Sequence, residues 1–369
     1  MESVTLVGIC TVLILVYYLI KWKYSYWERK GLHFIKPIIP YGNFKGIGST
    51  IHVSVLVQKW YNELKEKHKL FGIYSLHNPV ALITDIDLIN HMLIKDFNFF
   101  INRGVFYNER DDPLSGHLFN IEDQRWRTLR AKMTPAFTSG KMKFMYSTLI
   151  KVCKEFTKKI DSTLNETQGK SADIEIKDIL ARFTTDIIGE CAFGIECNSL
   201  SNPDAEFRKM GQKVFSPDLI TFFKQFISNA IPKICRFLRF RRTEGQVQDF
   251  FIRIVSETVS FRKQSNIKRN DFMDLLIALL DKNTKEGLTM NELTAQAFVF
   301  FLAGFETSST AMTFALYELA ANQDIQRKAR QEIEDVLEAH NGEFNYEAMT
   351  DMTYIKQIIN GKCSEIYVA

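Results

Sequence analysis

The sequence predicts a mainly α-helical fold with a small β region, preceded by one hydrophobic helix at the N-terminus. Val4 to Ile20 is an uncharged run of seventeen residues, close to the length that spans a bilayer. Residues 71–85 alternate in the manner of a β-hairpin, and almost all later segments carry the helical period. With 369 residues, of which 46% are hydrophobic and 24% charged, the chain is long enough for a large core.

Basic and aromatic residues flank the hydrophobic run. Four positive charges follow it directly, at Lys21, Lys23, Arg29 and Lys30. This asymmetry keeps the rest of the chain on the cytoplasmic side. A cleaved signal peptide is the alternative, but its positively charged leading end and small-residue cleavage site are absent. We therefore expect an uncleaved transmembrane signal anchor over residues 1–20. Four aromatic side chains are expected among the lipid headgroups, namely Trp22, Tyr24, Tyr26 and Trp27.

Residues 21–45 are predicted to form a basic and proline-rich linker. Two prolines and a glycine between Lys36 and Asn43 fix an extended turn and exclude a helix. The hairpin that follows is predicted to have strands Gly72 to Leu76 and Val80 to Thr84, joined by residues 77–79.

Charge and cysteine content exclude two classes of protein. The net charge of +4 is small for a chain of this size, which argues against nucleic acid as a main partner. The six cysteines show no Cys-x-x-Cys spacing and no histidines at metal-ligand intervals. They are expected to be reduced thiols in a cytosol-facing protein.

A long helix in the last quarter of the chain carries the most informative feature. Thr289 and Glu292 form a capping box, and residues 295–319 contain no proline and one glycine. Residues 303–307, Ala-Gly-Phe-Glu-Thr, then place an acid and a hydroxyl at mid-helix. Buried polar groups cost free energy unless they find partners, so this segment needs an explanation.

Three interpretations of residues 303–307 compete. A second transmembrane span is rejected because the apolar run, residues 295–305, has only eleven residues. In a core helix, the hydroxyls of residues 307–310 would bond back to earlier carbonyls. In a functional helix, Gly304 would leave room for a flat ligand, while Glu306 and Thr307 would form a short proton path to a reactive centre.

The segment resembles the oxygen-activating helix of the cytochrome P-450 monooxygenases. Upstream, residues 126–130 resemble the family's Trp-x-x-x-Arg element, with Trp126 and Arg130 on one helix face. Three longer stretches, residues 111–115, 132–142 and 186–195, are similar to the insect microsomal branch of the family. That branch is associated with plant toxins, insecticides and other lipophilic compounds.

The resemblance implies a fold and a cofactor. The fold would be the cytochrome P-450-like helical fold, with residues 46–369 as an incomplete catalytic domain. The cofactor would be haem. Trp126 and Arg130 would hold its propionates, and Ala303 and Gly304 would line its face.

The implied reaction is NADPH-driven insertion of one oxygen atom into lipophilic substrates, including endogenous lipids, with proton delivery by Glu306 and Thr307. The substrate pocket would be lined by Phe215, Phe222, Phe300 and Phe301. An NADPH-dependent flavoprotein reductase would dock on the basic residues between positions 125 and 143. The implied location is the endoplasmic reticulum membrane, with the bulk of the chain on the cytosolic side.

The C-terminal end departs from the family pattern. The family's Glu-x-x-Arg motif should begin at position 361, where this chain has Gly361-Lys362-Cys363-Ser364, and the later cysteine segment that binds haem iron is absent. Neither Cys191, expected in a buried helix, nor Cys363 has the surroundings of an iron ligand, so no metal ligand is assigned. We therefore expect an inactive member of the family, truncated at its C-terminus. The alternative is a non-catalytic, membrane-anchored protein that competes for the reductase.

Overall fold

The computed structural model describes residues 2–166, 171–215, 219–269, 271–280 and 287–366, with the side chains at 2–6, 9–10, 12–13, 219, 222–223 and 362–366 outside that description. The chain divides into two units, the first mainly residues 1–103 and the second mainly residues 104–368. Helices dominate, and the described part of the chain contains one two-stranded sheet. The predicted mainly helical fold with a small β region is confirmed.

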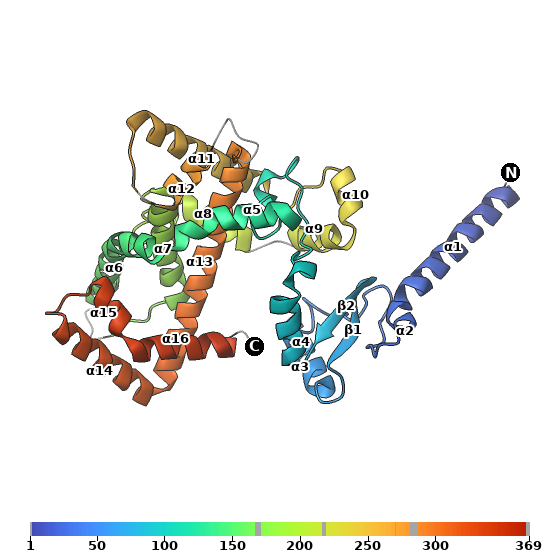
Figure 1. Cartoon of the computed structure of the whole chain (residues 1–369), viewed down its shortest axis with the longest axis horizontal. Coiled ribbons are helices and arrows are strands. Elements are labelled where there is room, and N and C mark those ends of the chain that lie inside the picture. Colours follow the sequence, from blue (N-terminus) through green and yellow to red (C-terminus); the bar gives the residue numbers. More distant parts are fainter. Residues whose placement is uncertain (1, 167–170, 216–218, 270, 281–286, 367–369) are drawn as a thin grey trace. The chain divides into compact units, whose positions relative to one another are not determined.

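The first unit combines short helices with the hairpin. Its N-terminal helix α1 extends as one long rod (Figure 1). Helix α4 begins after Asp85, whose carboxylate accepts a hydrogen bond from the Leu88 N–H at 2.8 Å. The elements are α1 Glu2–Tyr24, α2 Tyr26–Arg29, α3 Val53–Leu64, β1 Leu70–Ser75, β2 Asn78–Ile83, α4 Ile86–Asn90, the π-helix η1 His91–Lys95 and the 3₁₀ helix η2 Phe97–Phe99.

The predicted hairpin is present, but its turn lies earlier than predicted. The register pairs Tyr74 with Pro79 and Ser75 with Asn78, so Leu76 and His77 make the turn. Leu76 has a positive φ of 54° there. The sequence placed Asn78 and Pro79 in the turn because both residue types favour turns. Proline is tolerated in β2 because each strand of a two-stranded sheet has a free edge, where a missing N–H is harmless.

Trp27 lies in the core of the first unit, where the sequence predicted a position among lipid headgroups. Its side chain is 7% exposed, and its Nε1–H donates to the Ile73 carbonyl at 2.9 Å. The ring fills the space over Gly72, where a Cβ would collide with it. The Tyr74 hydroxyl donates to the Tyr24 carbonyl at 2.6 Å and accepts from the Trp27 N–H at 3.2 Å. Buried hydrogen bonds therefore fasten the segment after α1 to β1.

The second unit contains the long helices. Helix α12 begins after Asp271, whose carboxylate accepts a hydrogen bond from the Asp274 N–H at 3.0 Å. The elements are η3 Pro113–Ser115, α5 Asp123–Met133, η4 Thr134–Phe137, α6 Ser139–Glu166, α7 Ile176–Ile188, the π-helix η5 Gly189–Phe193, α8 Glu206–Phe215, α9 Leu219–Ala230, α10 Pro232–Phe237, α11 Gly245–Ser265, α12 Phe272–Ala278, α13 Met290–Ala321, α14 Gln323–Ala339, α15 Tyr346–Asp351 and α16 Thr353–Ile366.

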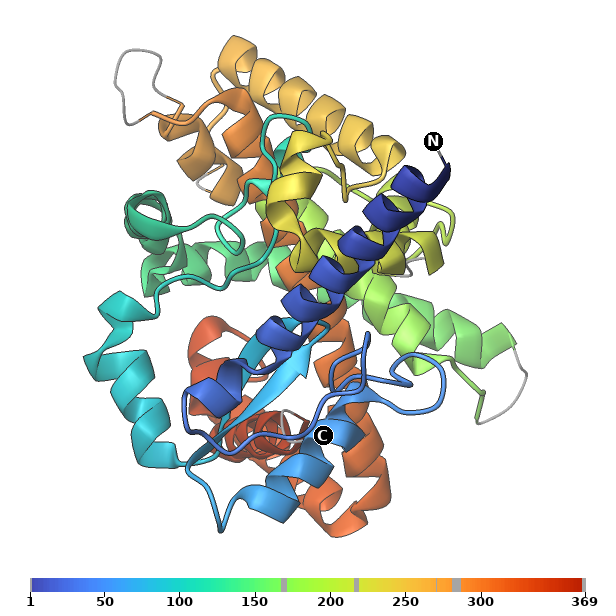
Figure 2. The ribbon, with the colours of Figure 1, turned by 90° about the vertical axis from the view of Figure 1, so that its right-hand side faces the viewer.

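Helix α13 runs through the middle of the second unit. Helices α11 and α12 contact it towards its N-terminal end, α7 packs along its middle, and α14 and α16 lie at its C-terminal end (Figures 1 and 2). The predicted capping box is present: the Glu292 N–H donates to Thr289 Oγ1 at 3.2 Å, and the Thr289 N–H donates to Glu292 Oε2 at 2.7 Å. The cap fixes where this helix starts.

Among the helices whose side chains are described throughout, α13 is the one long and apolar enough to cross a bilayer. The sequence rejected a span because its apolar run has eleven residues, but the helix itself has 32. A core helix passes the same test of length and composition, and Phe301 and Phe305 near its middle are almost fully buried in protein. The N-terminal half of α13 therefore lies in the core of this unit, and the C-terminal half is only partly buried.

Aromatic rings form the core around the N-terminal half of α13. The centroid of the Phe301 ring lies 5.1 Å from that of Phe207 on α8 and 5.2 Å from that of Phe251 on α11. Phe301 also stacks on Phe305 at 5.4 Å. Tilted and edge-to-face ring pairs add to the free energy of burial. These contacts hold α8 and α11 against α13 and so fix the position of residues 303–307.

Candidate functional site

Residues 303–307 of α13 pack against α7 on one side. The position that a Cβ on Gly304 would take is filled by the Ile188 side chain, so Gly304 lets the two helices approach closely. The Thr184 hydroxyl of α7 donates to the Phe305 carbonyl at 3.0 Å. The sequence assigned the space at Gly304 to a flat ligand; the structure gives that space to Ile188, because α7 crosses α13 there.

Glu306 points towards a group of charged side chains from α7 and α8. Its Oε1 lies 3.3 Å from Nζ of Lys177, whose side chain is 57% exposed. Beside this pair, Asp178 accepts from both Arg182 and Arg208. Burial lowers the pKa of Arg208, and the carboxylates of Asp178 and Glu306 oppose that change. The Glu306 carboxylate is thus held by a cation that reaches solvent.

The hydroxyls after Glu306 bond back to the helix. The Thr307 hydroxyl donates to the Ala303 carbonyl, and the Ser309 hydroxyl donates to the Glu306 carbonyl at 3.0 Å. This is the arrangement that the core-helix interpretation predicts. These hydrogen bonds account for the side chains of Thr307 and Ser309. The ion pair with Lys177 accounts for Glu306.

A second face of α13 is open. Ala303, Thr307 and Phe314 are exposed and share one helix face by their spacing of four and seven residues. Small side chains at Ala303 and Thr307 leave this face shallow. The segment therefore holds the Glu306 carboxylate towards α7. The Thr307 side chain, one residue further round the helix, lies on the open face, where a planar group can lie.

Trp126 and Arg130 lie on α5, one turn apart. Trp126 is half-buried and packs against the main core, whereas Arg130 is exposed. The cap residue Glu122 is extended, and the Trp126 N–H donates to its carbonyl at 3.2 Å. The two side chains keep the spacing that the sequence indicated, and they carry an indole N–H and a guanidinium.

The basic residues between positions 125 and 143 are partly neutralised within the chain. Arg125 pairs with Glu109 and with Glu292 of α13, the latter at 2.6 Å. Lys143 pairs with Glu347. Two of the charges predicted to face a reductase therefore serve contacts inside the second unit.

Of the four phenylalanines predicted to line one pocket, Phe215 and Phe301 both contact Phe305, whereas Phe300 packs elsewhere. Phe301 is enclosed by core rings, and Phe300 stacks on Phe272 of α12 with centroids 4.0 Å apart. Phe215 is 38% exposed and lies 5.8 Å from Phe305, centroid to centroid. The Phe222 side chain lies outside the described part of the chain. The helical rotation between Phe300 and Phe301 sends their rings to different neighbours.

A cavity of about 220 Å³ lies beside the N-terminal half of α13. Phe298 and Leu302, one turn apart on α13, form its apolar wall. Polar groups from other elements form most of the remaining lining, which consists of Ser115, His117, Asn120, Lys213, Val214, Thr221, Gln225, Arg242, Thr243, Glu244 and Val247. The sequence analysis missed His117 and Arg242, since a single histidine in a loop and one arginine among several carry no pattern.

His117 is the most perturbed titratable group on this cavity. Its side chain is 8% exposed, and burial, reinforced by the charge of Arg242, lowers its pKa to about 4. The Asn120 amide N–H₂ donates to the Ser115 carbonyl at 3.0 Å and lies 3.1 Å from His117 Nε2. Nε2 must then accept, so the proton of the neutral ring is on Nδ1. No hydrogen-bond partner for Nδ1 exists among the described residues.

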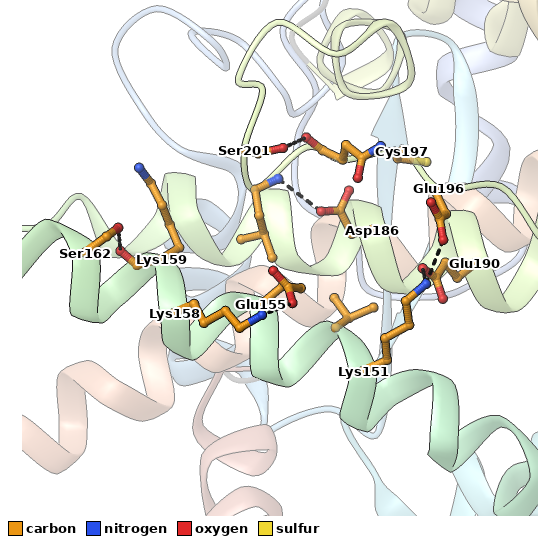
Figure 3. Close-up of a pocket in the computed structure, with 13 residues that line it drawn as sticks. Lys151, Glu155, Lys158, Lys159, Ser162, Asp186, Glu190, Glu196, Cys197 and Ser201 are labelled. Carbon is orange, nitrogen blue, oxygen red and sulfur yellow. Dashed lines mark hydrogen bonds and ion pairs between the residues drawn. The ribbon is translucent and has the colours of Figure 1, made fainter.

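A larger hollow of about 480 Å³ lies between α6 and the segment after α7 (Figure 3). Lys151 bridges Glu190 at 2.9 Å and Glu196 at 2.7 Å. Asp186 accepts from the N–H groups of residues 199 and 200 at 2.7 and 3.0 Å. Most of its charges already have partners within the chain, so the hollow is assigned no ligand.

The cysteines with described side chains are Cys153, Cys191, Cys197 and Cys235, and all four are free thiols. Cys191 lies in the π-helix η5 and is buried, as predicted. Burial, with the nearby charges of Glu190 and Asp271, raises its pKa to about 12. A protonated thiol is a poor metal ligand, which agrees with the absence of an assigned iron ligand.

Comparison with known proteins gives a consistent result. Residues 36–360 match the family model described as "Cytochrome P450". The chain is 44% identical to "Probable cytochrome P450 6a21" of Drosophila melanogaster over 353 residues, covering 93% of this chain and 69% of that protein. It is 45% identical to "Cytochrome P450 6a2" of the same species over 359 residues, covering 94% and 70%.

A relative from a second insect matches equally well. "Cytochrome P450 6A1" of Musca domestica is 43% identical over 354 residues, covering 94% of this chain and 68% of that protein. Each alignment includes most of the chain and about seven tenths of the relative.

Proposed function

Because the chain belongs to the cytochrome P450 family, we propose that it acts as a membrane-bound haem-thiolate monooxygenase on lipophilic compounds. The reaction would combine a substrate C–H bond, O2, NADPH and a proton to give an alcohol, water and NADP⁺, with electrons passed on by a flavoprotein reductase. The observation that carries the proposal is the Glu306–Lys177 pair beside the open face of Ala303 and Thr307.

Haem, when bound, would supply the centre that activates O2. Trp126 and Arg130 would donate hydrogen bonds to its propionates, and Arg130 would add a charge-assisted contact. Ala303 and Thr307 fit this group because their small, exposed side chains leave a shallow face on α13. The iron ligand is not assigned to any of the four described cysteines, because burial raises the pKa of their thiols. The proposed activity therefore requires a thiolate other than these four, and it departs from the inactive chain expected from the C-terminal sequence.

Glu306 and Thr307 would carry protons to this face. Lys177 holds the Glu306 carboxylate and is itself exposed, so the pair can exchange protons with water. Thr307 occupies the open side of the same turn, where its hydroxyl can exchange the Ala303 carbonyl for an acceptor on the reactants. A positioned acid of this kind contributes roughly 10²- to 10⁴-fold to a rate.

Lipophilic substrates would use the cavity at Phe298 and Leu302. Its volume of about 220 Å³ is below the ~300 to 1,000 Å³ of most ligand sites, which favours compact, rigid molecules. Most of the remaining lining of the cavity is polar or charged, including Lys213, Arg242 and Glu244, and could hold a polar group of the substrate. Xenobiotics such as plant toxins and insecticides, and small endogenous lipids, fit this chemistry.

Helix α1 is proposed as the membrane anchor. Its 23 residues span about 35 Å at ~1.5 Å per residue, enough for a hydrocarbon core of ~30 Å. Lys21 and Lys23 in its last turn favour a cytosolic position for the following chain at the endoplasmic reticulum. A reductase would dock on the basic face of α5. The non-catalytic alternative is less favoured, because Arg125 and Lys143 are tied up in ion pairs.

The test is oxygen incorporation by the full chain in microsomal membranes that also contain the reductase. With NADPH and isotope-labelled O2, we expect one labelled oxygen atom in each product molecule and full dependence on NADPH. Membranes with the reductase alone are the control. Product formation without label, or none above the control with haem bound, would contradict the proposal.

A further inference from the structure

Arg242 is a half-buried cation on the wall of the cavity beside α13. Its Nη1 donates to the Phe106 carbonyl at 3.2 Å. Within the described part of the chain, no Asp or Glu side chain pairs directly with the guanidinium, and none of its nitrogens is a buried atom without a partner. The N–H groups that Phe106 leaves unused are therefore accessible, in contrast to the enclosed Nδ1 of His117.

Asp112 fixes the backbone that carries this arginine. Its side chain is fully enclosed, and its Oδ2 accepts from the N–H groups of Arg242 and Thr243, both at 3.0 Å. Burial lowers the pKa of Arg242, and the charge of Asp112 opposes that change. Because Asp112 binds the backbone, it holds the arginine in place and leaves the guanidinium open to another acceptor.

The other charged groups on the cavity neutralise each other. Nζ of Lys213 lies 3.5 Å from Oε1 of Glu244, and the same amine donates to Gln246. His117 is neutral at pH 7, because its pKa is lowered to about 4. Among the described residues of the lining, Arg242 is therefore the charged group that lacks a counter-ion on the cavity wall.

Apolar side chains from three helices also line the cavity. They come from α8, α11 and α13 and are Val214, Val247, Phe298 and Leu302. An apolar body can be buried against them. A carboxylate gains more from a cation in such a partly dehydrated place than from one in open water. A molecule that carries both an apolar body and an acid group would match both parts of the lining.

We propose that the cavity binds lipophilic carboxylic acids, with the carboxylate on the guanidinium of Arg242 and the apolar body against Phe298 and Leu302. The neutral hydroxyls and amides of the lining can bind a carboxylate and an uncharged amide alike, so Arg242 makes the selection between them. The inference rests on the proposed substrate cavity, and it adds the chemical class of the substrate and the residue that selects it.

The experiment compares 1-naphthoate with 1-naphthamide, a carboxylate and an uncharged amide of nearly the same shape. Equilibrium dialysis at pH 7 gives the Kd of each for the full chain in phosphatidylcholine nanodiscs, against empty nanodiscs. Arg242→Gln removes the charge and keeps a donor for the Phe106 carbonyl. Arg241→Gln is the matched control, because it removes the same charge from an exposed neighbour that does not line the cavity.

The unaltered chain and Arg241→Gln should both bind 1-naphthoate about 10- to 100-fold more tightly than 1-naphthamide, since a hydrogen bond to a charged group contributes that factor. Arg242→Gln should reduce the preference to about 1- to 2-fold, chiefly by weakening the binding of 1-naphthoate. If Arg242→Gln does not fold, Arg242→Met takes its place with the same expected result. Leu302→Trp, which fills the cavity, should weaken the binding of both compounds by about 10-fold or more.

A full preference in Arg242→Gln, or in Arg242→Met where that variant replaces it, would overturn the inference and leave the proposed cavity standing. An equal loss of preference in Arg241→Gln would also overturn it, because net charge alone would then explain the effect. Equal binding of both compounds by the unaltered chain would do the same. If the unaltered chain bound neither compound, or if Leu302→Trp changed neither affinity, the cavity itself would be refuted as a substrate site, and the inference with it.

Discussion

The two halves of α13 treat polar groups in opposite ways. In the N-terminal half, Gln296 is neutral, fully enclosed and satisfied by three hydrogen bonds. At mid-helix, Glu306 is charged, partly exposed and held by one lysine that reaches solvent. A neutral amide can be buried once its bonds are made, whereas a carboxylate needs a counter-ion or water. The difference teaches that the first half holds the loop of residues 116–118, and it supports our proposal that the second exchanges protons.

The largest expected effect concerns the packing of the two halves. Phe301→Ala should lower the free energy of unfolding by ~3 to 5 kcal/mol, because the ring is buried among Phe207, Phe251 and Phe305. Phe314→Ala, on the open face at 48% exposure, should cost well under ~1 kcal/mol. Urea unfolding followed by circular dichroism measures both. Equal losses of unfolding free energy in the two variants would contradict the difference in burial between the two halves of α13.

His117, in the loop beside the buried half of α13, should make the stability of the protein depend on pH. The folded-state pKa of His117 is lowered to about 4, below the ordinary 6.5, so between these values the unfolded chain binds a proton that the folded chain does not. The His117 contribution is therefore complete above about pH 7 and falls by about 3 kcal/mol as the pH drops towards 4. His117→Gln should lack this part of the decline. Parallel curves for the two proteins would show that His117 is not buried as described.

Glu306, at the middle of α13, should control the rate of the proposed oxidation. Glu306→Gln should lower NADPH-dependent oxidation by roughly 100-fold with little change in KM, because a positioned acid is lost but the substrate cavity is not. Glu318→Gln, further along the same helix, is the control and should retain activity. Steady-state rates in reductase-containing membranes decide the matter. If the two variants behaved alike, Glu306 would not be the proton donor.

The sequence predicted the elements better than their partners. The capping box at Thr289 follows from a local rule, because it is set by side chains three residues apart. Trp27 was misplaced, since its burial depends on Gly72, far along the chain. Local pattern records which residues are apolar, but it does not record which distant strand or helix will cover them.

The same difference between local pattern and distant contact applies to the candidate site. Spacing alone put Glu306 and Thr307 on one turn of a helix, and the structure adds Lys177 from α7 as the partner. Gly304 was assigned to a ligand because a missing side chain signals close approach, but sequence does not say what approaches. His117 and Gln296 meet through a loop distant in sequence, so no local period could have revealed them.

The central claim is that haem lies against the open face of α13 and is held by Trp126 and Arg130 of α5. A haemin titration of the full chain tests this claim most directly. Absorbance in the Soret region gives the affinity of the unaltered chain, Arg130→Leu, Trp126→Phe and the neighbouring control Arg127→Leu. Arg130→Leu should weaken binding about 10-fold and Trp126→Phe by a smaller factor, since each removes a propionate donor, while Arg127→Leu should match the unaltered chain. Equal affinities for all four proteins would contradict the placement of haem between these helices.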